Sequence, residues 1–209
     1  MGLRETKKLR TRQEIADAAM RLFVKRGFDG VTVAEVAEAA NVSEKTVFNY
    51  FPTKEDLFFD EVDEREAKML ESIRRRRAGE SIVAAVRRLQ AGDCPRMCSP
   101  GFASFARIIE QSPALQAKEL EIMARFTESL AAAIQEELGV HEVDAKIAAN
   151  VLVSVHWQLF RNARAQALAG RHGPAAVRHL RSDLARAYEL LEHGLGQLGR
   201  VPKVASGSR

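Results

Sequence analysis

The chain has 209 residues, a formal net charge of +4 and 46% hydrophobic residues. This length allows one or two domains with an adequate core, and the mild positive charge is compatible with nucleic-acid binding without requiring it. No apolar run approaches the roughly 18 residues that span a bilayer, and the first residues lack the apolar stretch of a signal peptide.

The two cysteines, Cys94 and Cys98, do not make a disulfide framework, which indicates a reducing compartment. We therefore expect a cytoplasmic protein without membrane contact. β-branched and aromatic residues never alternate over a strand-length window, whereas apolar residues recur at helical spacing. The pattern predicts an all-α fold of about nine helices, with flexible tails at residues 1–8 and 201–209. The basic first ten residues either lie free in solvent or touch phosphates.

The first helix is predicted to begin at Thr11, with Glu14 as the partner in a capping box, and to end at Gly27. A second box, Thr32 with Glu35, predicts a short helix over Val33–Ala40. The turn falls at Asn41 and Val42. The first helix has an apolar stripe formed by Ile15, Ala18, Ala19, Leu22 and Phe23, and the second is predicted to bury Val33, Val36 and Ala37.

The next short helix follows Ser43, a good N-cap residue, and stops at Pro52. Val47, Phe48 and Phe51 are predicted to be its apolar anchors. A helix this short is not stable alone, and what it leaves exposed is rich in hydrogen-bonding groups. Two short helices, a tight turn and a longer helix before them predict a three-helix head.

One long helix is predicted over Glu55–Arg77, capped by Thr53 with Asp56, and it would join the head to the body. The basic run Arg74–Arg77 at its end is interpreted as favourable charge at a helix C-terminus in preference to a DNA contact.

The body is predicted to start with a helix over Glu80–Ala91 that Gly92–Pro95 breaks. The further segments are Met97–Ser112, Pro113–Leu138, Val143–Leu168 and Pro174–Leu198. Leu180, Leu184, Leu191 and Leu195 form a stripe that no later element covers. Soluble monomers avoid large exposed apolar patches, so this stripe predicts a homodimer.

The stretch TVAEVAEAANVSEKTVFNYFPTKEDLF, residues 32–58, closely resembles the N-terminal domain of the TetR family of transcriptional regulators. The resemblance covers about Thr11–Val62; beyond it, only the helical architecture is similar. It implies a DNA-binding domain over residues 9–69, with the helix-turn-helix at about 32–51. An effector-binding and dimerisation domain would occupy residues 70–200.

The resemblance also implies the function: a sequence-specific regulator, expected to be a repressor, that a small-molecule effector releases from a palindromic operator. Two protomers would pair through the last two helices as a four-helix bundle. Two alternatives stay open. One is a DNA-binding factor that has no small ligand, and the other is a helical carrier or enzyme that retains the head as a relic.

The residue types of the third helix suggest base contacts for Lys45, Thr46 and Asn49, because lysine can donate to guanine, asparagine can pair with adenine and threonine can meet a thymine methyl. In the family, the positions of Tyr50 and Lys54 hold phosphates, and Thr32 plays a similar role. Ser43 caps the helix, touches phosphate, or does both. Phe48 stands where the family commonly has tyrosine, and we interpret it as packing. Val33 and Ala34 offer no side-chain hydrogen bond for a base.

A family-like body would enclose an apolar cavity for a small apolar or amphipathic effector. The candidate lining residues are Met69, Met97, Phe102, Phe105, Met123, Phe126, Asn150 and Trp157. Each of them alone also fits ordinary core packing. His156 is interpreted as a satisfied core or interface residue in preference to a ligand contact.

No catalytic motif is found: the sequence has no glycine-rich phosphate loop, no HExxH and no GxSxG. Cys94 and Cys98 lack further ligands for a metal, and we interpret them as ordinary thiols, with a redox switch as the alternative. We therefore expect neither enzymatic activity, nor a metal, nor a cofactor.

Overall fold

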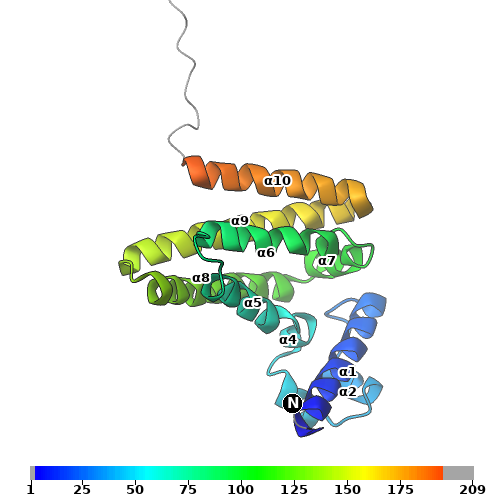
Figure 1. Cartoon of the computed structure of the whole chain (residues 1–209). Helices are drawn as coiled ribbons and strands as arrows, with labels where there is room; N and C mark the ends of the chain where they lie inside the picture. The colour runs from blue at the N-terminus through cyan, green and yellow to red at the C-terminus, as the bar shows by residue number, and fades with distance from the viewer. Residues whose placement is uncertain (1–2, 195–209) are drawn as a thin grey trace, which may run out of the picture.

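The computed structural model describes residues 3–194, which form ten helices and no strand (Figure 1). The elements are α1 (Leu3–Arg26), α2 (Val33–Ala39), α3 (Glu44–Tyr50), α4 (Lys54–Phe58), α5 (Val62–Arg74), α6 (Ile82–Met97), α7 (Phe102–Gln111), α8 (Pro113–Leu138), α9 (Glu142–Leu168) and α10 (Gly173–His193). The predicted all-α class is confirmed. The predicted division at residues 69 and 70 falls inside α5 and stays a prediction.

The head consists of α1 to α4, and the last three of these helices start where the caps predict. Thr32 and Thr53 each accept from the backbone N–H three residues on, and the carboxylates of Glu35 and Asp56 accept from the cap residues in return. Ser43 caps α3 in the same way through Thr46 N. These bonds satisfy backbone donors that a helix start leaves without partners.

The start of α1 differs from the prediction. The helix begins at Leu3, so the predicted flexible tail at residues 1–8 is wrong for residues 3–8, and Thr11 is not a cap. The Glu14 carboxylate instead accepts from Arg10 Nε at 2.8 Å, a favourable i, i+4 pair that supports helix on both sides of Thr11. Residues 1–2 and the predicted tail at 201–209 lie outside the described residues.

The predicted long helix Glu55–Arg77 is also wrong, because the chain leaves helical geometry between α4 and α5. Arg12 Nη2 donates to the Asp60 carbonyl at 3.0 Å, and an unbroken helix would commit that carbonyl to the backbone four residues on. Two adjacent rings pack at this break. Phe58 contacts Phe23 and Phe28 in the head, and the partly buried Phe59 lies edge-on to Phe58 and to Phe105 of the body.

In the body, α6 runs to Met97 through the predicted break at Gly92–Pro95. Pro95 lies in the last turn of this helix, where the missing N–H removes a single backbone bond. Gln90, Cys94 and Met97 are buried along one side, and this packing outweighs the weak helix propensity of glycine and proline. Two of the residues in the basic run after α5 pair across the body, Arg74 with Glu136 and Arg76 with Glu137.

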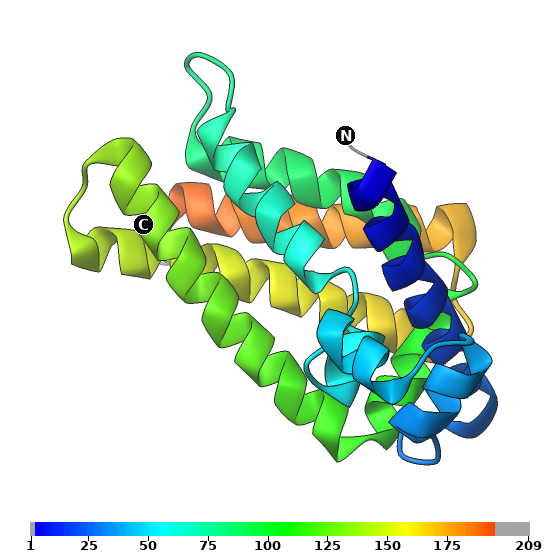
Figure 2. The same ribbon diagram turned by 90° about the horizontal axis from the view of Figure 1, so that it is seen from below.

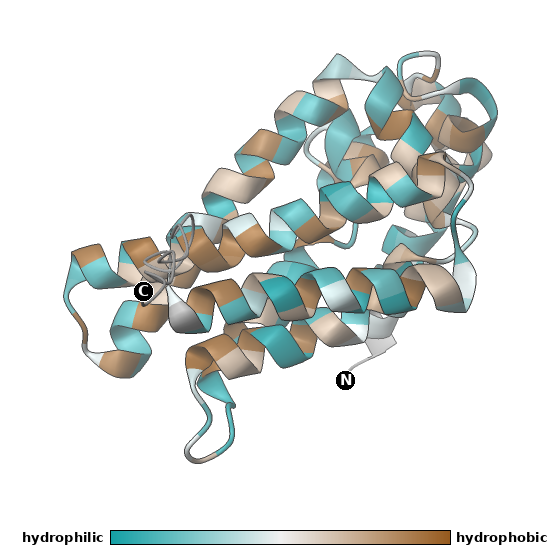
Figure 3. Ribbon diagram, turned by 90° about the horizontal axis from the view of Figure 1, so that it is seen from above, coloured by the Kyte–Doolittle hydropathy of each residue, from teal (hydrophilic) through white to brown (hydrophobic). Residues whose placement is uncertain are grey.

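The body has α8 packed along α9, with α5 and α6 closing one side and α10 lying across α6 and α9 (Figures 1 and 3). The predicted exposed stripe of the last helix is therefore wrong: Leu180 is fully buried and Leu184 is 4% exposed, covered within the same protomer. Leu195 lies outside the described residues. None of the described helices is long and apolar enough to cross a membrane.

The head sits against one end of the body, as the view from below shows (Figure 2). The junction is made by α1 packing on α7 and by α4 packing on α8. Phe58 belongs to both parts, because its ring also stacks on Phe105 of α7 with centroids 4.6 Å apart. The apolar core is thus continuous from the head into the body.

Candidate nucleic-acid interface and internal cavity

The turn between α2 and α3 gives the pair its helix-turn-helix geometry. Asn41 takes a left-handed conformation with φ 53°, which asparagine tolerates better than most residues. Val42 N donates to the Ala37 carbonyl at 2.9 Å and closes the turn onto α2. Val47 and Phe51, four residues apart, then bury the inner side of α3 against the head core.

The outer side of α3 is formed by Lys45, Phe48 and Asn49, which are all exposed. The interpretation of Phe48 as packing is wrong, since its side chain is 48% exposed. Phe48 follows the buried Val47 by one residue, and a helix turns about 100° in that step. Lys45 and Asn49 have no hydrogen-bond or ion-pair partner in the part of the chain that the structure describes, so their donors face solvent. This outer side is hereafter called the α3 face.

The hydroxyls near this face are already engaged. Thr32 Oγ1 donates to the Glu35 carboxylate at 3.0 Å, and Ser43 Oγ and Thr46 Oγ1 lie 2.8 Å apart in a hydrogen bond. A hydrogen bond from Arg26, at 2.6 Å, holds the pKa of Glu35 at about 2, so this carboxylate stays charged. Thr32, Ser43 and Thr46 therefore lie beside the α3 face with their hydroxyls partnered inside the head.

Tyr50 and Lys54 flank the end of α3 and are half-buried. The ammonium of Lys54 lies 4.2 Å from the centroid of the Phe28 ring, a cation–π contact, and burial lowers the pKa of this lysine. Its stem is thereby fixed at the edge of the head.

Arg12 of α1 ties this end of α3 to the break between α4 and α5. Its Nη1 donates to the Tyr50 carbonyl at 2.9 Å and its Nη2 to the Asp60 carbonyl at 3.0 Å. The guanidinium also lies 4.2 Å from the centroid of the Phe51 ring. This three-way contact is hereafter called the Arg12 clamp.

A first cavity of about 280 Å³ opens where the head meets the body. Its wall is made by α1, by the end of α4, by the break between α4 and α5, and by α5 to α9. The lining residues are Met20, Phe58, Phe59, Asp60, Glu61, Val62, Arg65, Arg96, Ser99, Gly101, Phe102, Phe105, Glu119, Ile122, Phe126, His156, Trp157 and Phe160.

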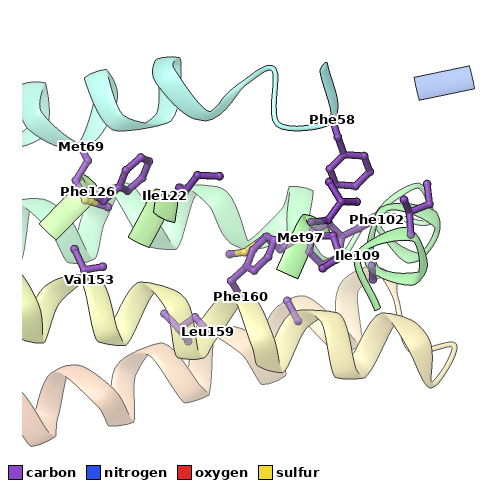
Figure 4. Packing of buried hydrophobic residues seen from close by; sticks show 14 of the residues in the cluster. Phe58, Met69, Met97, Phe102, Ile109, Ile122, Phe126, Val153, Leu159 and Phe160 are labelled. Carbon is purple, nitrogen blue, oxygen red and sulfur yellow. The ribbon is translucent and has the colours of Figure 1, made fainter. Parts of the chain in front are cut away.

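A second cavity of about 270 Å³ adjoins the first further along α5 and α6. Its lining residues are Glu61, Glu64, Arg65, Lys68, Met69, Leu89, Gln90, Asp93, Arg96, Phe126 and His156. The residues common to both walls are Glu61, Arg65, Arg96, Phe126 and His156. Figure 4 shows Met69 and Phe126 toward one end of this region, Phe58 and Phe102 toward the other, and Phe160 between them.

The predicted lining residues divide between the cavities and the core. Phe102, Phe105, Phe126 and Trp157 line the first cavity, and Met69 lines the second together with Phe126. Two others line neither cavity: Met97, which is buried in the core, and Met123, which is half-buried.

Asn150 is placed differently from the prediction. Its side chain is exposed, and Nδ2 donates to the Lys146 carbonyl one turn earlier on α9. His156 also departs from its interpretation as a satisfied core residue, because it lines both cavities and no hydrogen bond to another described residue is found.

Sequence reasoning missed the polar side of the cavities, which comes from α5, α6 and the break before α5. Charged residues at helical spacing look like a solvated face, so Glu61, Arg65 and Arg96 gave no signal.

Burial shifts the pKa values of two residues in this wall, Asp60 and His156. Burial, aided by the negative charge of Glu61, raises the pKa of Asp60 to about 6. Burial, aided by Arg65, lowers the pKa of His156 to about 4, so this imidazole is neutral at pH 7. Glu119 is satisfied by Arg164, whose Nη1 donates to both carboxylate oxygens at 2.8 and 2.7 Å.

The two cysteines, Cys94 and Cys98, are buried and free, and burial raises the pKa of each thiol, which makes both poor nucleophiles. No group of three or more histidine, cysteine, aspartate or glutamate side chains able to hold a metal is found within residues 3–194.

Comparison with known proteins identifies the head. Residues 15–60 match the model of the bacterial regulatory proteins of the tetR family. The transcriptional regulator TcmR of Streptomyces glaucescens is 28% identical over 147 residues, 66% of this chain and 65% of that protein. The regulator YvkB of Bacillus subtilis, named as uncharacterized, is 51% identical over 47 residues, 22% of this chain and 25% of that protein. The chain thus matches less than two thirds of the length of these curated relatives.

The fold of the whole chain has solved counterparts. The transcriptional regulator FadR of Bacillus subtilis, whose structure holds stearoyl-CoA, covers 84% of this chain with 97% of its own. The TM-score is 0.55 at 18% identity, which is a likeness of fold. The head therefore matches the tetR family of bacterial regulatory proteins in sequence, and the ten helices of residues 3–194 resemble a solved transcriptional regulator in fold.

Proposed function

We propose that this protein is a ligand-controlled transcriptional repressor that binds a palindromic operator as a homodimer through the α3 face. The single observation that carries this proposal is the set of unpartnered donors on Lys45 and Asn49, on the second helix of a helix-turn-helix. Such a helix enters the major groove, where lysine and asparagine read base edges.

The phosphate contacts belong to the rim of the α3 face. We propose Tyr50 and Lys54 for this role, with Thr32, Ser43 and Thr46 contributing only where DNA displaces their internal hydrogen bonds. The exposed Phe48 adds an apolar surface suited to a thymine methyl.

The test is selection of bound fragments from genomic DNA, followed by binding to a library of singly substituted operators. Lys45→Ala and Asn49→Ala should each relax preference at particular base pairs by about 1–3 kcal/mol. Tyr50→Phe and Lys54→Ala should weaken binding to all sequences alike, and Lys54→Ala should lower the salt dependence by about one phosphate contact.

Arg107→Ala on α7 is the control, because it removes one exposed basic residue from the body outside the proposed dimer interface and both cavities. It should leave both affinity and preference unchanged. A uniform loss for Lys45→Ala across the operator library would mean that this lysine contacts only the DNA backbone.

The two adjoining cavities support control by a small molecule. Cavities of this order hold small ligands, and aromatic walls with a few polar groups are typical of such sites. The solved FadR structure holds stearoyl-CoA, an amphipathic ligand in the same fold. Because the break between α4 and α5 forms part of the wall, an effector that fills the cavity would bias the position of the head and lower operator affinity, by about 1–3 kcal/mol.

Homodimerisation is supported by a different surface from the predicted one. Val143, Ile147 and Val151 recur every four residues along α9 and are exposed, and Leu190 of α10 is exposed as well. We propose this α9 stripe, together with α10, as the dimer interface, since helices that pair in a bundle need such an apolar face.

A further inference from the structure

The wall of the second cavity includes a buried glutamine whose amide donor no other described residue uses. Gln90 of α6 is 1% exposed and lines this cavity, and its Nε2 has no acceptor within residues 3–194. A buried amide N–H without an acceptor is destabilising, and such groups in proteins usually have a partner. The position of Gln90 on the cavity wall makes a bound molecule the natural source of that acceptor.

The orientation of this amide is set from the opposite side. Tyr188 of α10 donates its hydroxyl to Gln90 Oε1 at 3.2 Å. Tyr188 is fully buried, and burial raises its pKa, so the hydroxyl remains protonated and can donate. Because the tyrosine occupies the amide oxygen, the NH₂ group is the part of the side chain that is left for a ligand.

The charges around this donor favour an uncharged acceptor. The three basic residues of the second cavity are already paired with carboxylates: Arg65 and Arg96 with Glu61, and Lys68 with Glu64. Asp93, one turn from Gln90 on α6, has no ion-pair partner among the described residues, and burial raises its pKa. A ligand carboxylate beside Gln90 would lack a free cation and would face this carboxyl group.

The adjoining first cavity defines the rest of the ligand. Its wall carries Trp157 stacked on Phe160 and Phe102 stacked on Phe105, with ring centroids 5.6 and 5.7 Å apart. His156, neutral at pH 7, stands between the two cavities. The surroundings of the first cavity therefore suit flat apolar rings.

We propose that the effector is a ring-bearing apolar molecule with an uncharged carbonyl group, whose oxygen accepts a hydrogen bond from Gln90 Nε2. The rings occupy the first cavity and the carbonyl lies in the second. This inference rests on the ligand site of the proposed function and adds the chemistry of its polar contact.

The experiment uses three probes that share one ring system: fluorene, 9-fluorenone and fluorene-9-carboxylate. Their binding to the full chain is measured by equilibrium dialysis with chromatographic quantification. The wild type should bind 9-fluorenone about tenfold more tightly than fluorene, because the ketone satisfies the buried donor and the hydrocarbon does not. The carboxylate should bind more weakly than the ketone.

Gln90→Leu should abolish the preference for the ketone and leave fluorene binding intact. Gln166→Leu is the matched control, because Gln166 is also buried with an unpartnered Nε2 but lines neither cavity. It should keep the tenfold preference. Tyr188→Phe, which removes the hydroxyl that orients the amide and leaves the cavity wall unchanged, should reduce the preference about threefold; it serves as the second variant if Gln90→Leu fails to fold.

The outcomes separate this inference from the proposed function. Equal binding of fluorene and 9-fluorenone, or a ketone preference that survives Gln90→Leu, overturns the role of Gln90 while the ligand cavity stands. If fluorene-9-carboxylate binds more tightly than 9-fluorenone, the proposal that the acceptor on the ligand is uncharged is overturned. If none of the three probes binds, the ring-bearing effector is overturned, while control by a small molecule of another class, and DNA binding through the α3 face, stand.

Discussion

Asp60 is the residue at which the head, the Arg12 clamp and the first cavity meet. Its carbonyl accepts from Arg12, and its carboxyl group lines the cavity with a pKa raised from 3.8 to about 6. Between these two pH values the folded protein holds a proton that the unfolded chain has released. The free energy of unfolding therefore falls as pH rises from about 4 to about 6.

Asp60→Asn should remove this pH-dependent cost. At pH 7.5 the variant should be more stable than the wild type by about 2–3 kcal/mol, and at pH 5 the gain should be clearly smaller. Urea unfolding at the two pH values measures the difference. Glu128→Gln, which changes an exposed carboxylate on α8, should give no pH-dependent difference. An equal gain for Asp60→Asn at both pH values would show that the carboxyl group is not perturbed by burial.

Single residues were predictable from the sequence where their partners are close in the chain. The caps Thr32, Ser43 and Thr53 bond to atoms three residues away, so their roles can be read locally. Gln90 and Tyr188 are 98 positions apart, and their contact exists only in the folded chain. The DNA candidates on α3 came from residue types and from the family resemblance and stay predictions, whereas the polar wall of the cavities gave no local signal.

At the scale of the elements, the Arg12 clamp joins three segments: α1, the end of α3 and the break after α4. Arg12→Met keeps an apolar stem beside Phe51 but removes both hydrogen bonds from the guanidinium. Hydrogen bonds from a charged group contribute about 1.5–3 kcal/mol each, and their contributions overlap. The variant should lose about 2–4 kcal/mol of stability in urea unfolding.

Arg10→Met is the control on the same helix. Arg10 forms an exposed ion pair with Glu14, and its loss should change stability by about 0.5 kcal/mol or less. Similar effects of the two substitutions would contradict a structural role for the Arg12 clamp.

The same clamp explains why helix boundaries were predicted unevenly. Nothing in the sequence between residues 55 and 77 breaks a helix, and the break follows from Arg12, 48 positions earlier. The opposite error occurred in α6, where Gly92 and Pro95 suggested an end that burial of Cys94 and Met97 overrides. Local propensity is a weak guide wherever a distant side chain or a core face competes with it.

At the scale of the whole molecule, the dimer prediction now concerns α9. Ile147 is 58% exposed in the middle of the α9 stripe. Ile147→Arg should convert a dimer into a monomer in sedimentation and abolish tight operator binding, because one head alone makes too few contacts. Leu120→Arg is the control: it places the same charge on a leucine of α8 that is 60% exposed and lies outside the proposed interface.

A monomeric wild type would end this proposal, and so would a dimer that survives Ile147→Arg.

The leucine stripe of α10 has a different role. Because Leu184 is buried against its own protomer, Leu184→Arg should cost about 3 kcal/mol or more and unfold the chain before it affects assembly.

The overall architecture was predictable because it depends on the period of apolar residues, which survives local errors at helix ends. Which side of a helix stays exposed to solvent was not predictable from this period. Leu180 and Leu184 have the same spacing as Val143 and Ile147, and only the packing of α10 on α6 decides which pair faces solvent.

Phe58 has a consequence for how this protein can diverge. Its ring packs with Phe23 and Phe28 in the head and stacks on Phe105 in the cavity wall. A substitution at Trp157, whose ring contacts Phe160 of the body, can change the shape of the cavity while the DNA-binding unit keeps its core. A substitution at Phe58 alters both at once. During evolution, new effector specificities are therefore expected to arise through changes on α7 and α9. Position 58 is expected to remain phenylalanine, because a change there would alter the DNA-binding head and the cavity together.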